Sequence, residues 1–213
     1  MKTKFVIVRH GESLGNAKRI ILGHTDWDIT DLGKRQAEVT TEALANRHFD
    51  AVYSSDLCRA YNTVLPAATS RGLAVIPEQG LREQFVGDWE GCPVNELIEQ
   101  YGELYTVNWR HHFGTFRAPG GESIPELGRR IENTLAKIAK ENPGKSILIG
   151  THAAAIRAFW GRINHIAPED LNDAFPFPTN ASYSEVEFDD GLFTPISYSC
   201  DAHLSGMITA FKS

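Results

Sequence analysis

Two short stretches of the chain combine residue types that can bind and transfer a phosphoryl group. Arg9, His10 and Gly11 lie in "VRHGES", and His152 lies in "GTHAAAIR". A neutral histidine, with a reference pKa of about 6.5, is a good nucleophile, and an arginine binds phosphoryl oxygens through paired N–H donors. A glycine beside them lets the backbone pass close to a ligand. Taken alone, "VRHGES" fits a solvated turn after a strand equally well.

Further candidates for the same chemistry lie elsewhere in the chain. Arg59 follows the polar stretch "SSD" at 54–56, and Glu83 ends the stretch "LRE". A carboxylic acid can protonate the oxygen that leaves phosphorus. Phosphoryl transfer needs mainly positioning and charge stabilisation, which arginine and histidinium supply without a metal ion. We therefore expect chemistry that uses neither a metal ion nor a cofactor.

Each of these residues follows a predicted strand. Apolar runs at 5–8, 51–53, 73–76 and 146–150 predict buried strands. Two later strands, at 182–188 and 192–197, flank the turn sequence "DDG". Because the carboxyl ends of parallel strands share one edge of a sheet, the polar residues that follow them could converge there.

Helices are predicted between these strands. Thr30 is a plausible N-cap for a helix that runs toward Asn46, and Asp56 could cap the helix that holds Arg59. A capping box at 123–126 starts a helix expected to reach about residue 140, and another helix spans 153–159. The alternation predicts an α/β fold, a three-layer α/β/α sandwich with a mostly parallel central sheet. We expect one domain over 1–213, with a lid-like insertion at about 84–120.

Composition excludes several classes of protein. The chain has 213 residues, 42% of them hydrophobic and 23% charged, with a formal charge of -6, which argues against a nucleic-acid or acidic-membrane surface. The three widely spaced cysteines indicate reduced thiols rather than a disulfide framework. We read no signal peptide in the first residues and no apolar run of about 18 residues. A cytoplasmic protein is expected.

The order of the motifs resembles that of a known family. "VRHGESLGN", "GHTDWDITDLGKRQA", "VYSSDLCRAYNT", "LREQFVGDWEG", "PGGES" and "GTHAAAIR" follow one another along nearly the whole chain. Each block is modest, but together they are similar to the histidine phosphatase superfamily, also called phosphoglycerate mutase-like. The compact length resembles its phosphatase-type members.

The resemblance implies roles at the matching positions. His10 would be the nucleophile, forming a phosphohistidine through one ring nitrogen while a backbone carbonyl holds the other. Arg9 and Arg59 would bind the phosphoryl oxygens, and His152 would stabilise the transferring charge. Glu83 would act as the general acid for the leaving group and then as the base that activates water.

Other positions are weighed against structural roles. Asn16 would add an amide to the phosphate site, and Ala153 would line it where the family often has glycine, which restricts the backbone there. The expected substrate contacts are Ser13, Leu22, Gly23, His24 and Phe85. We expect Glu12 to make a structural hydrogen bond and Arg82 an ion pair. His111 and His112 are adjacent and would point to opposite faces of a strand, so we expect no metal site.

Three functions remain open on this evidence. The first is a phosphomonoester hydrolase, of the histidine acid phosphatase type, that acts on a small phosphorylated metabolite and releases inorganic phosphate. The second is a phosphoglycerate mutase, but such enzymes carry a longer, arginine-rich insertion, whereas 84–120 offers only Arg110 and Arg117. The third is a non-catalytic phospho-ligand sensor, which would be expected to lose its nucleophile or its acid. The late hairpin and "LSGMITAF" leave a homodimer open.

Overall fold

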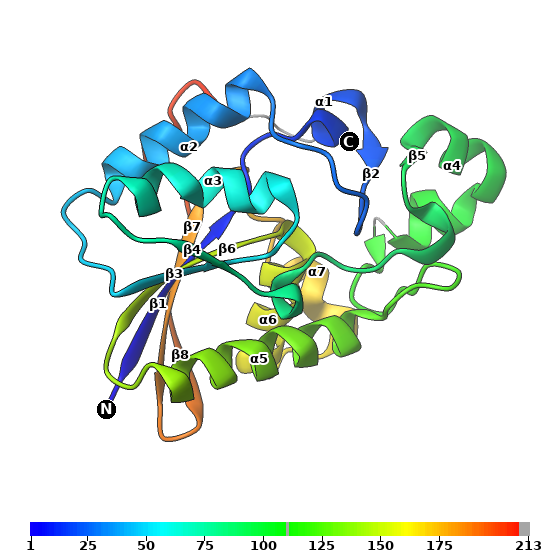
Figure 1. Ribbon diagram of the computed structural model, residues 1–213. Coiled ribbons are helices and arrows are strands. Elements are labelled where there is room, and N and C mark those ends of the chain that lie inside the picture. Colours follow the sequence, from blue (N-terminus) through cyan, green and yellow to red (C-terminus); the bar gives the residue numbers. More distant parts are fainter. Residues whose placement is uncertain (110, 209–213) are drawn as a thin grey trace.

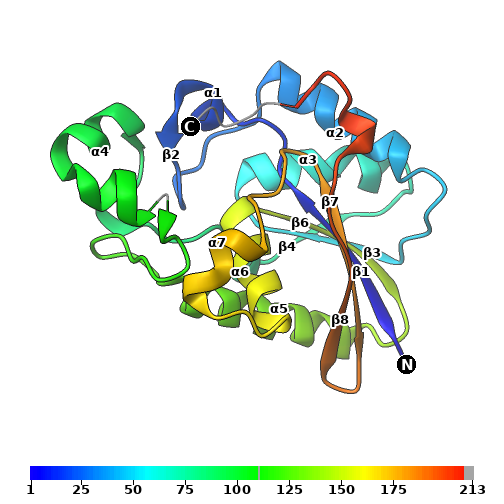
Figure 2. The same cartoon turned by 180° about the vertical axis from the view of Figure 1, so that it is seen from behind.

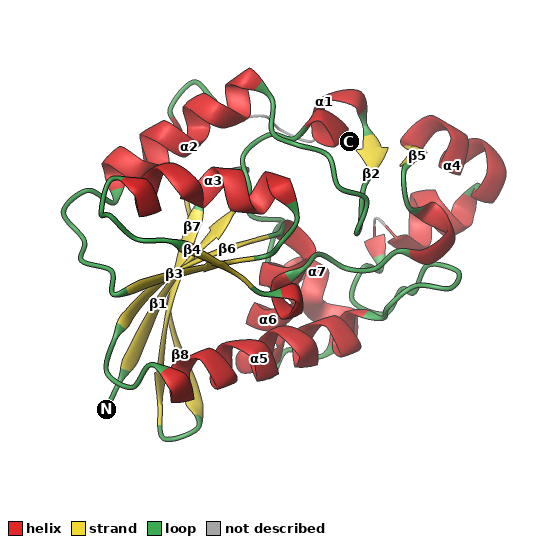
Figure 3. Cartoon of the chain, viewed as in Figure 1, coloured by secondary structure: helices red, strands yellow, loops and turns green. Residues whose placement is uncertain are grey.

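A six-stranded sheet lies between two layers of helices (Figures 1 and 3). The computed structural model describes residues 1–109 and 111–208, so Arg110 and the end of "LSGMITAF" lie outside the described residues. The strand order is β4-β3-β6-β1-β7-β8, and β7 is antiparallel to both of its neighbours while the four strands before it run parallel. The strands are β1 (Thr3–Arg9), β3 (Ala51–Ser54), β4 (Val75–Pro77), β6 (Ser146–Thr151), β7 (Tyr183–Asp189) and β8 (Leu192–Cys200). The predicted α/β fold with a mostly parallel sheet is confirmed.

The alternation of side chains along β1 explains why both faces of the sheet are covered. Phe5 and Ile7 join the core under α5 (Ile124–Glu141) and α6 (Ala153–Ile163). Val6 and Val8 point the other way, into the core under α2 (Asp31–Ala43) and α3 (Cys58–Thr69). Figure 1 shows these two helix pairs on opposite sides of the sheet. Successive side chains of a strand alternate between faces, so an uninterrupted apolar run indicates a sheet buried on both sides.

The register of the central strands determines where the site forms. Arg9, at the end of β1, is the partner of Thr151 at the end of the parallel strand β6. The next residue of each chain segment is a histidine, His10 and His152. The predicted convergence of strand ends therefore follows from the pairing of β1 with β6.

The helix caps agree with the sequence at two positions and differ at one. The Thr30 side chain accepts the Gly33 N–H, and the capping box at Ser123 is present. The prediction that Asp56 caps α3 is wrong, because its carboxylate binds Arg82 through two charged hydrogen bonds. Such bonds are stronger than a bond to a neutral N–H. The expected ion pair of Arg82 is thereby present.

The insertion at 84–120 has a small core of its own. It contains β5 (Cys92–Pro93), α4 (Val94–Tyr101) and a π-helical segment, Leu104–Trp109. Trp89 is fully buried there among aromatic rings. β5 pairs with β2 (Ile20–Ile21), which follows α1 (Leu14–Lys18). The insertion therefore lies beside β2, at the edge of the molecule in both views (Figures 1 and 2).

Short helical elements complete the chain. They are α7 (Leu171–Ala174) and the 3-10 turns Gln79–Leu81, Gly87–Trp89, Pro168–Asp170 and Ala202–Leu204. In the described part of the chain, no helix is both long enough and apolar enough to span a membrane.

Candidate active site

The polar residues at the strand ends meet in one cavity of about 430 Å³. Its polar end is lined by Arg9, His10, Asn16, Arg59, Glu83 and Ala153. His152 lies directly behind this end, with its ring 5.3 Å from the ring of His10. All the residues that we expected to contact the phosphoryl group therefore lie together, although they come from four separate parts of the sequence.

His10 is held in one tautomer. Its Nδ1 lies 2.7 Å from the carbonyl oxygen of Gly11, so Nδ1 carries the proton and donates it to that oxygen. The side chain is buried, and burial, together with the charges of Arg59 and Arg9, lowers its pKa well below 6.5. The imidazole is thus neutral at neutral pH, with an unprotonated Nε2. This is the state that a nucleophilic histidine needs.

Arg9 and Arg59 bring positive charge to this end of the cavity. Arg59 donates to the carbonyl oxygens of Gly23 and Thr25, at 2.6 and 2.9 Å. Arg9 donates to the carbonyl oxygen of Pro178, and burial lowers its pKa to about 10, so it stays charged at neutral pH. The side-chain hydrogen bonds described for both go to backbone carbonyls rather than to carboxylates. Two buried cations without a bonded carboxylate favour an anionic ligand.

His152 is the N-cap residue of α6 and is fully buried. Its Nε2 lies 2.9 Å from the hydroxyl oxygen of Ser55. Burial, Arg59 and His10 lower its pKa well below 6.5, so the ring is neutral while the cavity holds no anion. The negative charge of a bound phosphate would raise the pKa of His152 and so oppose the lowering by Arg59 and His10.

Glu83 lies at the first turn of α6, where backbone N–H groups orient its carboxylate. The N–H groups of Gln84, Ala155 and Ala154 donate to it at 2.8, 3.1 and 3.3 Å. Ala153 begins the same helix, and α-helical backbone accepts an alanine without strain.

Asn16 is oriented by two partners, one of which the sequence did not reveal. Its Oδ1 accepts from the backbone N–H of Ser13 and from Nδ2 of the buried Asn180, which also donates to the carbonyl oxygen of His10. The amide nitrogen of Asn16 must therefore point away from these donors. Ser13 caps α1 and also lines the cavity.

The first loop is shaped by a close contact between two glycines. A Cβ atom on Gly11 would lie 2.7 Å from the carbonyl oxygen of Gly33, and one on Gly33 would lie 2.3 Å from that of Glu12. The glycine in "VRHGES" is thus required by packing against α2. Glu12 makes the expected structural hydrogen bond, accepting from the Thr30 hydroxyl at 2.8 Å.

The expected substrate contacts divide into two groups. Ser13, Leu22 and Gly23 line the cavity, whereas His24 and Phe85 do not belong to its lining. Those two rings pack against each other with centroids 5.4 Å apart, and His24 Nε2 lies 2.8 Å from the Glu83 carbonyl oxygen. The two rings therefore lie beside Glu83, and Phe85 is 39% exposed.

Much of the remaining cavity wall is apolar. Its side chains come from β2, from the insertion and from the segment before β7: Ile20, Ile21, Val86, Val94, Ile98, Tyr105, Trp109, Phe113 and Phe177. The aromatic stretch "LYTVNWRHHFG" was the available signal for part of this surface. Of the two adjacent histidines, His111 lines the cavity, and both are exposed.

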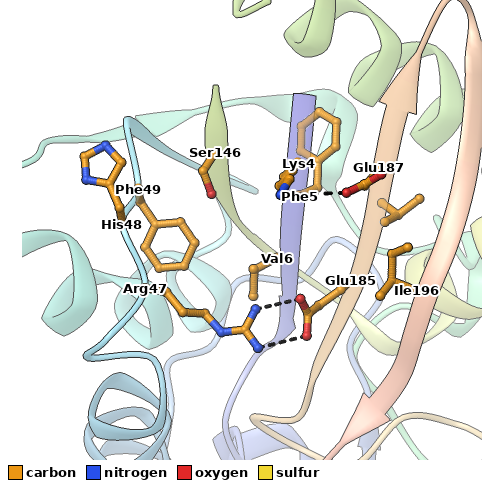
Figure 4. Close-up of a pocket in the computed structure, with 11 residues that line it drawn as sticks. Lys4, Phe5, Val6, Arg47, His48, Phe49, Ser146, Glu185, Glu187 and Ile196 are labelled. Atoms are coloured by element: carbon orange, nitrogen blue, oxygen red, sulfur yellow. Dashed lines mark hydrogen bonds and ion pairs between the residues drawn. The ribbon is translucent and has the colours of Figure 1, made fainter. Parts of the chain in front are cut away.

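A second cavity, of about 400 Å³, lies at the other end of β1 (Figure 4). There Arg47 binds Glu185 through two hydrogen bonds of 2.6 and 2.9 Å, and Lys4 faces Glu187. Its charges are already paired, so it offers less to an anion than the first cavity. Over the described residues, no three histidine, cysteine, aspartate or glutamate side chains are grouped as a metal site.

Comparison with known proteins agrees with this geometry. Residues 5–201 match the histidine phosphatase superfamily, branch 1. The chain belongs to this superfamily. It is 33% identical over 207 residues to the metal-independent phosphoserine phosphatase of Arabidopsis thaliana, covering 96% of this chain and 84% of that one. It is 34% identical over 170 residues to a 2,3-bisphosphoglycerate-dependent phosphoglycerate mutase of Cytophaga hutchinsonii, covering 78% and 79%.

Solved structures share this fold. Bacillus stearothermophilus YhfR superposes with a TM-score of 0.88 over 95% of this chain and 99% of that one, at 23% identity. The curated relatives act in two ways according to their names, as phosphatases and as mutases. Membership therefore indicates an enzyme that acts on phosphate esters.

Proposed function

We propose that this histidine phosphatase family member is a metal-independent phosphomonoester hydrolase that acts through a phosphohistidine on a small phosphorylated metabolite. The observation that carries the proposal is the neutral His10, held by Gly11 with Nε2 unprotonated beside two buried arginines. The name of the Arabidopsis relative supports the independence from metal.

In the first step, His10 Nε2 attacks phosphorus and the bond from phosphorus to the ester oxygen breaks. Glu83 gives its proton to that oxygen, and the alcohol leaves. Arg9, Arg59 and the Asn16 amide bind the phosphoryl oxygens, while His152, which takes up a proton from solvent as the anion binds, stabilises their charge. In the second step, Glu83 takes a proton from water, the water oxygen bonds to phosphorus, and the bond to Nε2 breaks, which releases inorganic phosphate and restores His10.

We also propose that the chain is a single domain in which 84–120 acts as a lid over the cavity. Side chains of this segment, such as Val94 and Trp109, form part of the cavity wall. A cytoplasmic location and action without a cofactor, a nucleic acid or a membrane belong to the same proposal.

Phosphate release from a panel of small phosphomonoesters, measured with a chelator present, tests the function. His10→Ala should remove turnover almost entirely, because losing a nucleophile that acts within a catalytic unit costs about a millionfold in subtilisin. Activity that appears only when metal is added would contradict the proposal.

A phosphoglycerate mutase is the second candidate, because relatives such as the Cytophaga protein carry that name. The same assay with 3-phosphoglycerate and its bisphosphate separates the two. Interconversion of phosphoglycerates without phosphate release would favour the mutase. Ligand binding without turnover of either kind would favour a phospho-ligand sensor.

A further inference from the structure

The cavity wall has two chemically different parts, a polar part around His10, called the phosphate end, and a larger set of apolar side chains, called the apolar end. Positive and hydrogen-bonding groups gather around His10, while the rest of the wall is built from aliphatic and aromatic side chains. Ile98 and Phe177 are 39% and 45% exposed and both line this cavity. Large apolar side chains that remain exposed at a cavity indicate a surface that a ligand covers.

Charge at the apolar end is sparse. Among the lining residues that the structure describes, the titratable side chains away from the phosphate site are Arg19, Tyr105 and His111. Arg19 and His111 are exposed to solvent, and the ring of Tyr105 is buried against Trp89 and Trp109. A second anionic group on a substrate would need a buried, oriented cation, as Arg9 and Arg59 supply for the first. An ammonium group would likewise need a carboxylate, and Glu83 lies at the phosphate end.

The apolar wall is also fixed in place. Arg157, on α6, places its guanidinium carbon 4.3 Å from the ring centre of Phe177 and 4.9 Å from that of Phe113. The two rings meet edge to face at 4.9 Å. Trp109 packs on Tyr105 and on Trp89 of the insertion core. A wall held from behind in this way costs little ordering when a ligand binds.

Resting on the proposed function, we infer that the preferred substrates are phosphomonoesters of apolar, uncharged alcohols. The phosphoryl group binds at His10, and the organic group packs against Val94, Ile98, Phe113 and Phe177. Burying even a few carbon atoms favours such a substrate by about tenfold or more over a polar one of similar size. The chain then differs in specificity from relatives named for phosphoserine or phosphoglycerate.

Turnover of esters with similar leaving groups tests this inference. Benzyl phosphate, 3-phosphoglycerate and phosphoserine are all esters of aliphatic alcohols, so kcat/KM compares the organic groups. We expect benzyl phosphate to exceed both by about tenfold or more. A higher kcat/KM for either charged ester would overturn the inference while leaving the phosphatase intact. Failure of all three would count against the proposed function instead.

Binding gives a readout that does not depend on turnover. By calorimetry, benzylphosphonate should bind at least about tenfold more tightly than 2-carboxyethylphosphonate. Equal affinities, or tighter binding of the carboxylate, would overturn the inference even for an inactive protein.

One variant pair localises the effect. Ile98→Lys places a cation at the cavity mouth and should shift the ratio of the two affinities toward the carboxylate by about fivefold or more. Gln100→Lys puts the same charge on an exposed position of α4 outside the lining and should leave the ratio unchanged. Equal shifts in both variants would mean that general charge, rather than this wall, sets the preference.

Discussion

At the scale of single residues, the site depends on keeping two histidines neutral beside two arginines. Desolvation does most of this, because it penalises the charged form of His10 and His152 more than any neighbour does. The arginines keep their charge because guanidinium cannot easily lose its proton. A neutral nucleophile and an anion-binding site can therefore coexist in one buried place.

This arrangement makes stability depend on pH. The folded pKa of His10 and His152 lies well below 6.5, so below that pH the unfolded chain binds protons that the folded protein does not. The neutral histidines make their full contribution to the free energy of unfolding above about pH 6.5. This contribution is lost as the pH falls through their folded pKa values. The free energy of unfolding should thus decrease from pH 7.5 to pH 5, as measured by urea denaturation.

His152→Gln should flatten this decrease, since it removes one of the two titrating groups. His48→Gln, at an exposed imidazole, serves as the control and should keep the slope of the unmodified protein. An unchanged slope in His152→Gln would show that the buried histidine does not titrate as described.

Glu83 is expected to matter most when the leaving alcohol is a poor leaving group. Glu83→Gln keeps the shape of the side chain but cannot donate a proton, so kcat/KM for alkyl phosphates should fall about a hundredfold or more. The loss should be clearly smaller for p-nitrophenyl phosphate, whose leaving group needs no proton. Glu12→Gln, at a carboxylate bonded to Thr30, is the matched control. Equal losses for aryl and alkyl esters would argue against Glu83 as the acid.

At the scale of elements, α6 connects the phosphate site to the apolar wall. Its first turn orients Glu83, and one turn later Arg157 donates to the Phe175 carbonyl and to Asn172 while packing on Phe113 and Phe177. Burial lowers the pKa of Arg157 to about 10, and the guanidinium stays charged among these partners. One helix therefore positions groups at both ends of the cavity.

Arg157→Lys tests this connection. Lysine keeps the charge but loses the planar group that both rings and the acceptors contact, so the free energy of unfolding should fall by about 2 kcal/mol. KM for benzyl phosphate should rise more than kcat falls, because the wall rather than the reacting groups is disturbed. Arg162 also lies on α6, at an exposed position where it pairs with Glu132 of α5, so Arg162→Lys should change stability by less than about 0.5 kcal/mol. Similar effects of both substitutions would contradict a positioning role for Arg157.

At the scale of the whole molecule, sequence patterns predicted the sheet and the phosphate end but not the apolar end. The strand ends were predictable because apolar runs reveal parallel strands and parallel strands share an edge, which brings His10 and His152 together. Phe177 and Ile98 lie far apart in the sequence and in no shared periodic pattern, so only the packing of the insertion against the segment before β7 brings them into one wall. The role of Asn180 could not be predicted from the sequence either, since its hydrogen bond to the His10 carbonyl joins two residues that only the tertiary fold brings together.

In the proposed mechanism, the phosphoryl group is transferred to Nε2 of His10 before it passes to water. The direct test mixes the protein with p-nitrophenyl phosphate, quenches in alkali, where phosphohistidine survives, and locates the added phosphoryl group by peptide mass spectrometry. We expect phosphorylation on the peptide that contains His10, and none in His10→Ala. Phosphorylation at another residue, or full turnover by His10→Ala without a phosphorylated protein, would contradict it.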